Sequence, residues 1–242
     1  MKSSFYRRGL TLVEVVVGIA IAGIVIALLL PAVRTVRPAA RRNQCLNNLK
    51  LIAIALQNYA DAHGGALPPA YTIDANGKPL DSWRILILPY MEEQALYDSI
   101  DLTKPWDDPA NAEACKKSLS AYQCPSAPFD DNRTTYLAVI TSNSCMRATE
   151  PRPLPDTKNA SKAMTVIEVD EEHAVPWMSP VDADEQVVLA LGGPNSKLDH
   201  PGVTLAAFAD CHTESLSGDL PADQRRALIS IDCGDKAAEA AE

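Results

Sequence analysis

The sequence lacks the short motifs by which many enzymes are recognised. No Ser, His and Asp catalytic motif, H-E-x-x-H helix, phosphate-binding loop or nucleotide fingerprint occurs in its 242 residues. Its six cysteines include no C-x-x-C pair, which argues against a zinc ribbon or a thioredoxin-type redox site. We therefore expect no active site and no enzymatic activity.

Positive charge is also scarce. Lys and Arg total 22 against 31 Asp and Glu, for a net charge of −9. A nucleic-acid surface needs clustered Lys and Arg to replace the phosphate counterions, so no nucleic-acid partner is expected. The basic residues lie instead around one apolar run: Lys2, Arg7 and Arg8 before it, and Arg34, Arg37, Arg41 and Arg42 after it.

That run, residues 10–30 (LTLVEVVVGIAIAGIVIALLL), carries Glu14 as its single charge. As a helix it is roughly 32 Å long, which matches a bilayer hydrocarbon core. A cleaved secretory signal has a shorter apolar region that ends at small residues, so it fits less well. The pattern predicts a basic leader over residues 1–9 and a transmembrane helix over residues 10–33.

A second helical pattern continues to residue 63. Apolar side chains recur at spacings of four and three residues and so form one stripe, which consists of Cys45, Leu49, Ile52, Leu56 and Tyr59. Gly64 and Gly65 then supply a left-handed stop. We expect residues 34–63 to continue the helix outside the membrane, with this stripe packed under a sheet.

The remaining chain predicts a head domain over residues 64–235 and a flexible tail over 236–242. Apolar and β-branched runs indicate strands at 134–141, 164–169 and 203–209, and a final helix at 221–229. A weak helix is expected at 111–122, and loops at 150–162 and 173–199. One amphipathic helix, helical inserts and late strands together predict an α+β fold.

The residues Arg7-Arg8-Gly9-Leu10-Thr11-Leu12-Val13-Glu14 resemble the prepilin N-terminal cleavage and methylation motif of type IV pilins and type II secretion pseudopilins. The resemblance implies that a membrane prepilin peptidase cuts after Gly9 and methylates the new amino terminus at Leu10, where the family usually has Phe. It also implies a type IV pilin-like fold, in which a long N-terminal helix packs on a mainly antiparallel sheet.

Glu14 is the predicted assembly residue. A carboxylate in a membrane helix costs up to about 2.5–3.5 kcal/mol, so it should have a partner. In pilin-like assemblies that partner would be the α-amino group of a neighbouring subunit's Leu10. The alternative is that Glu14 only reaches toward the membrane interface.

Further segments resemble a pilin-like family of unknown function abundant in planctomycete-type bacteria. They are residues 45–59 (CLNNLKLIAIALQNY), 82–111, 122–128 (YQCPSAP) and 175–180 (VPWMSP). The family's C-terminal signature is His, nine residues, then Asp-Gly. His200 and Asp210 keep that spacing, whereas Cys211 replaces the glycine of a tight hairpin.

An even number of cysteines in an exported head suggests disulfides, and sequence alone leaves fifteen pairings of six cysteines open. Buried free thiols are the alternative. Because Cys45 and Cys124 lie in the segments that best match the family, they are the first expected pair. Cys211 with Cys233 is the second candidate, since a bridge there would hold the altered hairpin.

The resemblance implies a structural subunit of an extracytoplasmic filament, a type IV pilus or a type II secretion pseudopilus. Its partners would be the prepilin peptidase, copies of itself or other pilin-like subunits, and the inner membrane. We expect a single-pass protein with a cytoplasmic N-terminus and an extracytoplasmic head. The alternative is a membrane-anchored secreted metal-dependent enzyme that uses His200, Asp210 and His212, which His63 and His173 could join.

No cofactor is expected, with calcium kept as a candidate because heads of the major pseudopilin class bind it through acidic loop oxygens. The nearest acidic candidates, Asp182, Asp184 and Glu185, do not form a recognisable ligand pattern.

Overall fold

A computed structural model describes residues 11–129, 131–154, 157–192 and 196–230, without the side chains of residues 27–37 and 157–158. The chain comprises two compact units, Met1–Ala40 and Arg41–Glu242. The expected leader, residues 1–9, and the expected tail, residues 236–242, lie outside the described residues.

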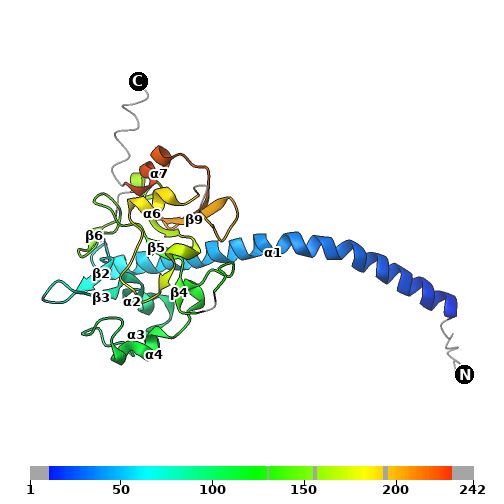
Figure 1. The fold of residues 1–242 in the computed structure, drawn as a ribbon, viewed down its shortest axis with the longest axis horizontal. Helices are drawn as coiled ribbons and strands as arrows, with labels where there is room; N and C mark the ends of the chain where they lie inside the picture. Colours follow the sequence, from blue (N-terminus) through cyan, green and yellow to red (C-terminus); the bar gives the residue numbers. More distant parts are fainter. Residues whose placement is uncertain (1–10, 130, 155–156, 193–195, 231–242) are drawn as a thin grey trace, which may run out of the picture. The chain divides into compact units, whose positions relative to one another are not determined.

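Helix α1 runs from Leu12 to Ala62 and continues through Pro31 and Pro38 (Figure 1). Its C-terminal end has the predicted left-handed stop, with φ of 70° at Gly64 and 84° at Gly65. The Gly65 amide donates to the carbonyl of Ala60 at 2.8 Å, which satisfies one of the last carbonyls of the helix. The predicted helical continuation over residues 34–63 therefore ends one residue earlier than expected.

In the described part of the chain, no helix combines the length and the apolar character needed to cross a membrane. The expected span over residues 10–33 includes residue 10 and the side chains of 27–33, which lie outside the described part. The span stays a prediction.

The head contains a four-stranded antiparallel sheet in the order β10-β9-β7-β5 (Figure 1). The strands are β5 (Tyr136–Ala138), β7 (Met164–Glu168), β9 (Val203–Phe208) and β10 (Thr213–Ser217). The predicted runs at 134–141, 164–169 and 203–209 thus contain three neighbouring strands of one sheet. Together with α1 they confirm the predicted α+β class.

Alternation along these strands separates two cores. Tyr136, Ala138, Val166, Leu205 and Ala207 share one core cluster with the apolar stripe of α1: Cys45, Leu49, Ile52 and Leu56 are buried, and Tyr59 is half-buried. The intervening strand residues belong to a second cluster with α6 (Glu185–Ala190) and α7 (Ala222–Ile229). Because successive side chains of a strand point to opposite faces, α1 covers one face of the sheet and α6 and α7 cover the other.

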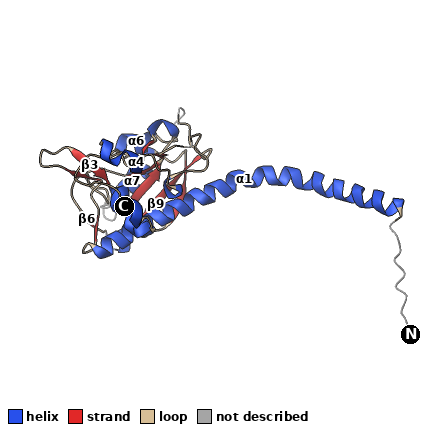
Figure 2. Ribbon diagram, turned by 90° about the horizontal axis from the view of Figure 1, so that it is seen from below, coloured by secondary structure: helices blue, strands red, loops and turns tan. Residues whose placement is uncertain are grey.

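The rest of the head is built from short pieces joined by loops (Figure 2). Three two-stranded ribbons pair β1 (Ala66–Leu67) with β6 (Arg152–Pro153), β2 (Tyr71–Ile73) with β3 (Pro79–Ser82), and β4 (Arg133–Thr134) with β8 (Val175–Pro176). The short helices are α2 (Trp83–Leu86), α3 (Gln94–Tyr97), α4 (Ala112–Cys115), α5 (Thr157–Ala160), η1 (Leu88–Met91), η2 (Pro109–Asn111), η3 (Ser120–Tyr122) and η4 (Glu171–His173).

Four sequence predictions about elements are corrected by the structure. The weak helix expected at 111–122 is broken into α4 and η3. The loop expected at 150–162 contains β6 and α5, and the loop expected at 173–199 contains β8 and α6. β10 was not anticipated. β10 pairs with β9 over five residue pairs. Its own sequence is polar and does not favour a strand, so the pairing with β9 is what stabilises it.

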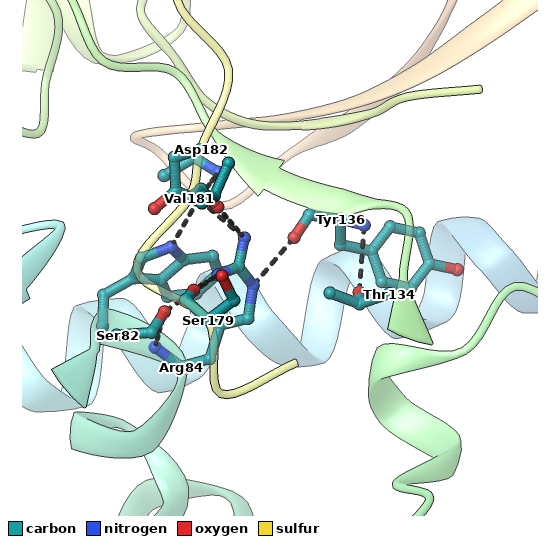
Figure 3. Close-up of polar contacts among 9 residues, drawn as sticks. Ser82, Arg84, Thr134, Tyr136, Ser179, Val181 and Asp182 are labelled. Carbon is teal, nitrogen blue, oxygen red and sulfur yellow. Dashed lines mark hydrogen bonds and ion pairs between the residues drawn. The ribbon is translucent and has the colours of Figure 1, made fainter. Parts of the chain in front are cut away.

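A buried ion pair joins α2 to the loop before α6. Arg84 Nη2 lies 2.6 Å from Asp182 Oδ1, and the Arg84 Nε donates to the Tyr136 carbonyl at 3.1 Å (Figure 3). Asp182 Oδ1 also accepts from Trp83 Nε1 at 3.0 Å and from the Ala138 amide at 2.8 Å. The pair therefore fixes α2 and the 179–182 segment against strand β5.

Candidate functional site

The predicted processing residues, Gly9 and Leu10, lie outside the described residues. The predicted assembly residue, Glu14, lies in the first turn of α1 and is exposed. Its Oε2 accepts from the Thr11 amide at 2.8 Å and from the Thr11 hydroxyl at 2.9 Å, and the Glu14 amide donates to Thr11 Oγ1 at 3.3 Å. This arrangement is a capping box, a role for Glu14 that the sequence reasoning missed although Thr-x-x-Glu is its signature.

The described residues of the first unit expose apolar side chains on all sides of α1. Leu12 is 81% exposed, Ile19 69% and Ile24 62%, and the remaining Val and Ile residues from 13 to 26 are 46% exposed or more. A helix that is apolar all round needs lipid or other helices around it.

Inside the head, four side chains of the types that can bind a metal ion lie close together. The Cys45 and Cys124 sulfur atoms are 2.8 Å apart, Cys124 Sγ lies 3.5 Å from His200 Nε2, and His200 Nε2 lies 3.5 Å from Glu168 Oε2. All four ligand atoms lie within 4.8 Å of one another, and all four residues are buried. We call Cys45, Cys124, Glu168 and His200 the donor cluster.

Four separate segments supply the donor cluster. Cys45 belongs to the sheet-covering stripe of α1, and Cys124 follows η3. Glu168 ends β7, next to Ile167 of the opposite core, so its side chain points to the α1 face of the sheet. His200 precedes β9 and bridges to Val203. The packing of α1 on the sheet is therefore what brings these residues together.

The surroundings of Glu168 and Cys124 favour the neutral forms of these two side chains. Burial and the neighbouring Cys124 raise the pKa of Glu168 well above its usual range. The contact with the Cys45 thiol and burial raise the pKa of Cys124 in the same direction. A positive ion among these groups would favour their deprotonated forms.

Two buried oxygen atoms at the donor cluster have no hydrogen-bond partner. They are Glu168 Oε1 and the hydroxyl of Tyr136, the residue opposite Glu168 in the β5–β7 pairing. Buried polar atoms are nearly always paired, so each such exception calls for an explanation.

A cavity of about 270 Å³ reaches the donor cluster from the surface. Cys124 lines it, together with Gln44, Ser120, Gln123, Pro125, Ala127 and Phe129. Cys124 itself is only 4% exposed. The cavity therefore borders the donor cluster at Cys124.

The two cysteines of the first expected disulfide pair lie next to each other as free thiols. Cys45 and Cys124 are free in the structure, whereas a disulfide would place the sulfur atoms about 2.05 Å apart. The bond itself stays a prediction. Cys233, the expected partner of Cys211, lies outside the described residues.

The alternative metal triad is not assembled. His200 precedes β9, while Asp210 and His212 follow it, so a six-residue strand, about 17 Å long, separates them. The Asp210 carboxylate and the His212 ring contact each other at 2.5 Å on the hairpin turn. The geometry therefore does not favour an enzyme that uses these three residues, because His200 belongs to the donor cluster.

Cys211 has the left-handed backbone conformation that favours glycine. Its φ is 65°, and its amide donates to the Phe208 carbonyl at 2.9 Å, closing the turn between β9 and β10. The Cys211 Sγ contacts the carbonyl of Ala53 at 3.4 Å. Cys211 thus occupies a positive-φ position of the kind that glycine usually fills.

The three acidic candidates for calcium are engaged separately. Asp182 belongs to the ion pair with Arg84, Asp184 caps α6 by accepting from the Val187 amide at 2.9 Å, and Glu185 Oε1 lies 2.7 Å from Arg226 Nε. They do not share one site.

Sequence reasoning missed the donor cluster because its residues are far apart in the chain and have no ligand spacing. Two of its members, Cys45 and Cys124, stood out as an expected pair. Glu168 lies in an otherwise apolar strand. A single carboxylate in such a strand was the one sequence feature that could have indicated a functional site.

Comparisons with known proteins agree with both resemblances. No curated protein and no solved structure matches the chain. Residues 5–30 match the model of the prokaryotic N-terminal methylation motif, and residues 34–174 match that of the family described as "Protein of unknown function (DUF1559)". Because this second match covers more than half of the chain, the chain belongs to the DUF1559 family of unknown function, as a prepilin-like member with an N-terminal methylation motif.

Proposed function

We propose that the chain is a structural subunit of an extracytoplasmic filament, either a type IV pilus or a type II secretion pseudopilus. A prepilin peptidase cleaves after Gly9, and the N-terminal part of α1 then docks beside the helices of neighbouring subunits. The observation that carries this proposal is the methylation motif at residues 5–30, which overlaps the exposed apolar side chains of residues 12–26.

Two environments would cover this apolar surface, and the proposal uses both in turn. Before assembly, the inner membrane surrounds the helix as a single span. After assembly, helices of neighbouring pilin-like subunits replace the lipid. The leader stays cytoplasmic and the head extracytoplasmic. The four arginines after the span oppose this orientation on a simple charge count, but the processing motif has meaning only with this topology.

The test is mass spectrometry of the N-terminus from native membranes. We expect a mature chain that begins at Leu10, because a glycine before the cut leaves room for the peptidase. Gly9→Phe should leave the precursor uncut in the membrane. Gly18→Leu is the matched control, since a side chain at Gly18 meets no atom within 4 Å, and it should be processed normally. Recovery of intact Met1, or cleavage near Ala32, would contradict the proposal.

A further inference from the structure

We propose that the donor cluster is a structural metal site that binds one divalent transition-metal ion, with Zn²⁺ as the best match. This site is independent of the filament role. It would link α1 to the Cys124 loop, the end of β7 and the start of β9, four segments far apart in the sequence.

The chemistry of the donors selects the metal. Two thiols, one imidazole and one carboxylate are a mixed sulfur, nitrogen and oxygen set, which suits zinc better than calcium or magnesium, since those ions prefer oxygen ligands. Four protein ligands also match the closed coordination of a structural zinc ion, with no position left for a substrate. Burial of all four residues supports a structural rather than a catalytic role.

Two buried oxygen atoms without a hydrogen-bond partner, Glu168 Oε1 and the Tyr136 hydroxyl, also support a metal site. Glu168 Oε1 is buried with no hydrogen-bond partner, and a metal ion bound by the Glu168 carboxylate would supply a partner for this oxygen. The Tyr136 hydroxyl, also buried and unpaired, could then donate to a ligand thiolate or carboxylate, as outer-shell groups do at metal sites.

Binding is an exchange of protons for the ion. Each thiol must lose its proton to become a ligand, so Zn²⁺ uptake releases two protons to solvent, and a third if Glu168 is protonated beforehand. The cavity lined by Cys124 borders the site and would be the route for the ion. No electron transfer is involved. The proposed site takes the place of the expected Cys45–Cys124 disulfide, whose formation would need an oxidant and would exclude the metal.

The first experiment uses the full chain purified in detergent, without chelator and under an inert atmosphere. We expect about one Zn²⁺ per chain by elemental analysis. Replacement by Co²⁺ should give the visible bands of tetrahedral cobalt and the charge-transfer absorption of thiolate ligands. The cobalt spectrum needs no variant, so it does not depend on whether a mutant folds.

The second experiment assigns the site to its residues. Cys124→Ser and His200→Gln should each weaken Zn²⁺ binding at least about tenfold. Cys145→Ser is the matched control because Cys145 is equally buried and outside the donor cluster, and it should retain full occupancy. Circular dichroism establishes that each compared variant is folded.

Three results would overturn the proposal. One is reduced chain that takes up no stoichiometric Zn²⁺ or Co²⁺. Another is unchanged metal content in a folded Cys124→Ser variant, which would place the ion elsewhere. The third is a Cys45–Cys124 disulfide in protein isolated without reductant, since the two sulfur atoms cannot then serve as thiolate ligands.

Discussion

At the scale of single residues, Arg84 and Asp182 form an ion pair that stabilises two charged side chains in the core. The Arg84 side chain is fully buried, and that of Asp182 is 4% exposed. Burial raises the pKa of Asp182, and the Arg84 guanidinium partly offsets that rise. Trp83 and the Ala138 amide donate to the same oxygen, Asp182 Oδ1, whereas Asp182 Oδ2 is buried without a hydrogen-bond partner. The sequence motif SWRILILPY thus carries a structural arginine rather than a surface one.

Removal of the arginine should therefore be costly. We expect Arg84→Met to lower the free energy of unfolding by about 3–5 kcal/mol, because Asp182 is left buried without its cation. Arg147→Met is the matched control, since the ion pair of Arg147 with Glu150 is exposed and should contribute less than about 1 kcal/mol. Urea titrations of the purified proteins measure both values. Equal losses in the two variants would refute the buried-pair argument.

Asp81 gives a pH-dependent prediction. Burial raises the pKa of its carboxyl to about 7, and the Thr72 hydroxyl contact offsets only part of that rise. Between pH of about 4 and 7 the folded chain therefore keeps a proton that the unfolded chain releases. Stability from this group is present below that window and is lost as pH rises through it, by at most roughly 1.4 kcal/mol per pH unit.

Asp81→Asn should reduce this loss. The variant and the wild type are compared by urea unfolding at several pH values. We expect the variant to gain stability relative to wild type as pH rises from about 4 to 7. Asp199, whose pKa burial raises to about 6, is present in both proteins, so the difference between them isolates Asp81. Parallel pH profiles would show that Asp81 is not the responsible group.

At the scale of elements, the second half of α1 is stabilised by its contact with the sheet. Leu49 is fully buried in this contact, whereas Leu51, two positions later, is 54% exposed. Leu49→Ala should destabilise the head by about 2–5 kcal/mol through lost packing and a cavity. Leu51→Ala should change stability by no more than about 0.5 kcal/mol. Thermal unfolding of the two variants distinguishes the faces, and similar losses would contradict the predicted stripe.

The β9–β10 hairpin offers a test of backbone strain. Cys211 adopts φ of 65°, a region that costs a residue with a Cβ roughly 1–2 kcal/mol. Cys211→Gly should therefore raise the free energy of unfolding by up to about 1 kcal/mol, after loss of the sulfur contact with Ala53. Cys115→Gly at the end of α4 is the opposing control. Cys115 has no positive φ to relieve, so the variant should lower the free energy of unfolding by roughly 0.4–1 kcal/mol through the greater freedom of the unfolded chain. A loss of stability in Cys211→Gly would mean that the sulfur contact outweighs the strain.

At the scale of the whole molecule, the filament proposal depends on the first turns of α1. Glu14 has two functions in this account: it caps its own helix through Thr11, and it supplies the charge that a neighbouring amino terminus would meet. The two functions can be separated, because glutamine also completes a capping box but carries no charge.

Glu14→Gln should therefore leave folding and cleavage intact and reduce incorporation into filaments. Crosslinking in membranes at equal expression measures the ladder of oligomers for wild type and variant. The same ladder in both would rule out a register role for Glu14. Normal cleavage at Gly9 in the variant is the necessary control, since an uncut precursor could not assemble for a different reason.

Local patterns in the sequence determined much of the fold. The periodicity of Cys45, Leu49, Ile52 and Leu56 predicted the buried face of α1, and the glycine pair at 64–65 predicted its end. Three strands were visible because their β-branched and apolar residues are consecutive. The methylation motif was equally local, and it matched the comparison. Each of these features depends on neighbours within a few residues, so the order of residues alone specifies it.

The tertiary structure decided what depends on distant partners. β10 is stabilised by its pairing with β9. Asp182 forms a buried ion pair with Arg84, which lies nearly a hundred positions away in the chain. The alternative enzyme hypothesis placed His200 beside Asp210 and His212, but β9 separates His200 from the other two residues. The sequence did not predict the donor cluster, because Cys45 and Glu168 come together only when α1 packs on the sheet. Contacts between segments separated by long stretches of chain depend on the three-dimensional path, which local periodicity does not encode.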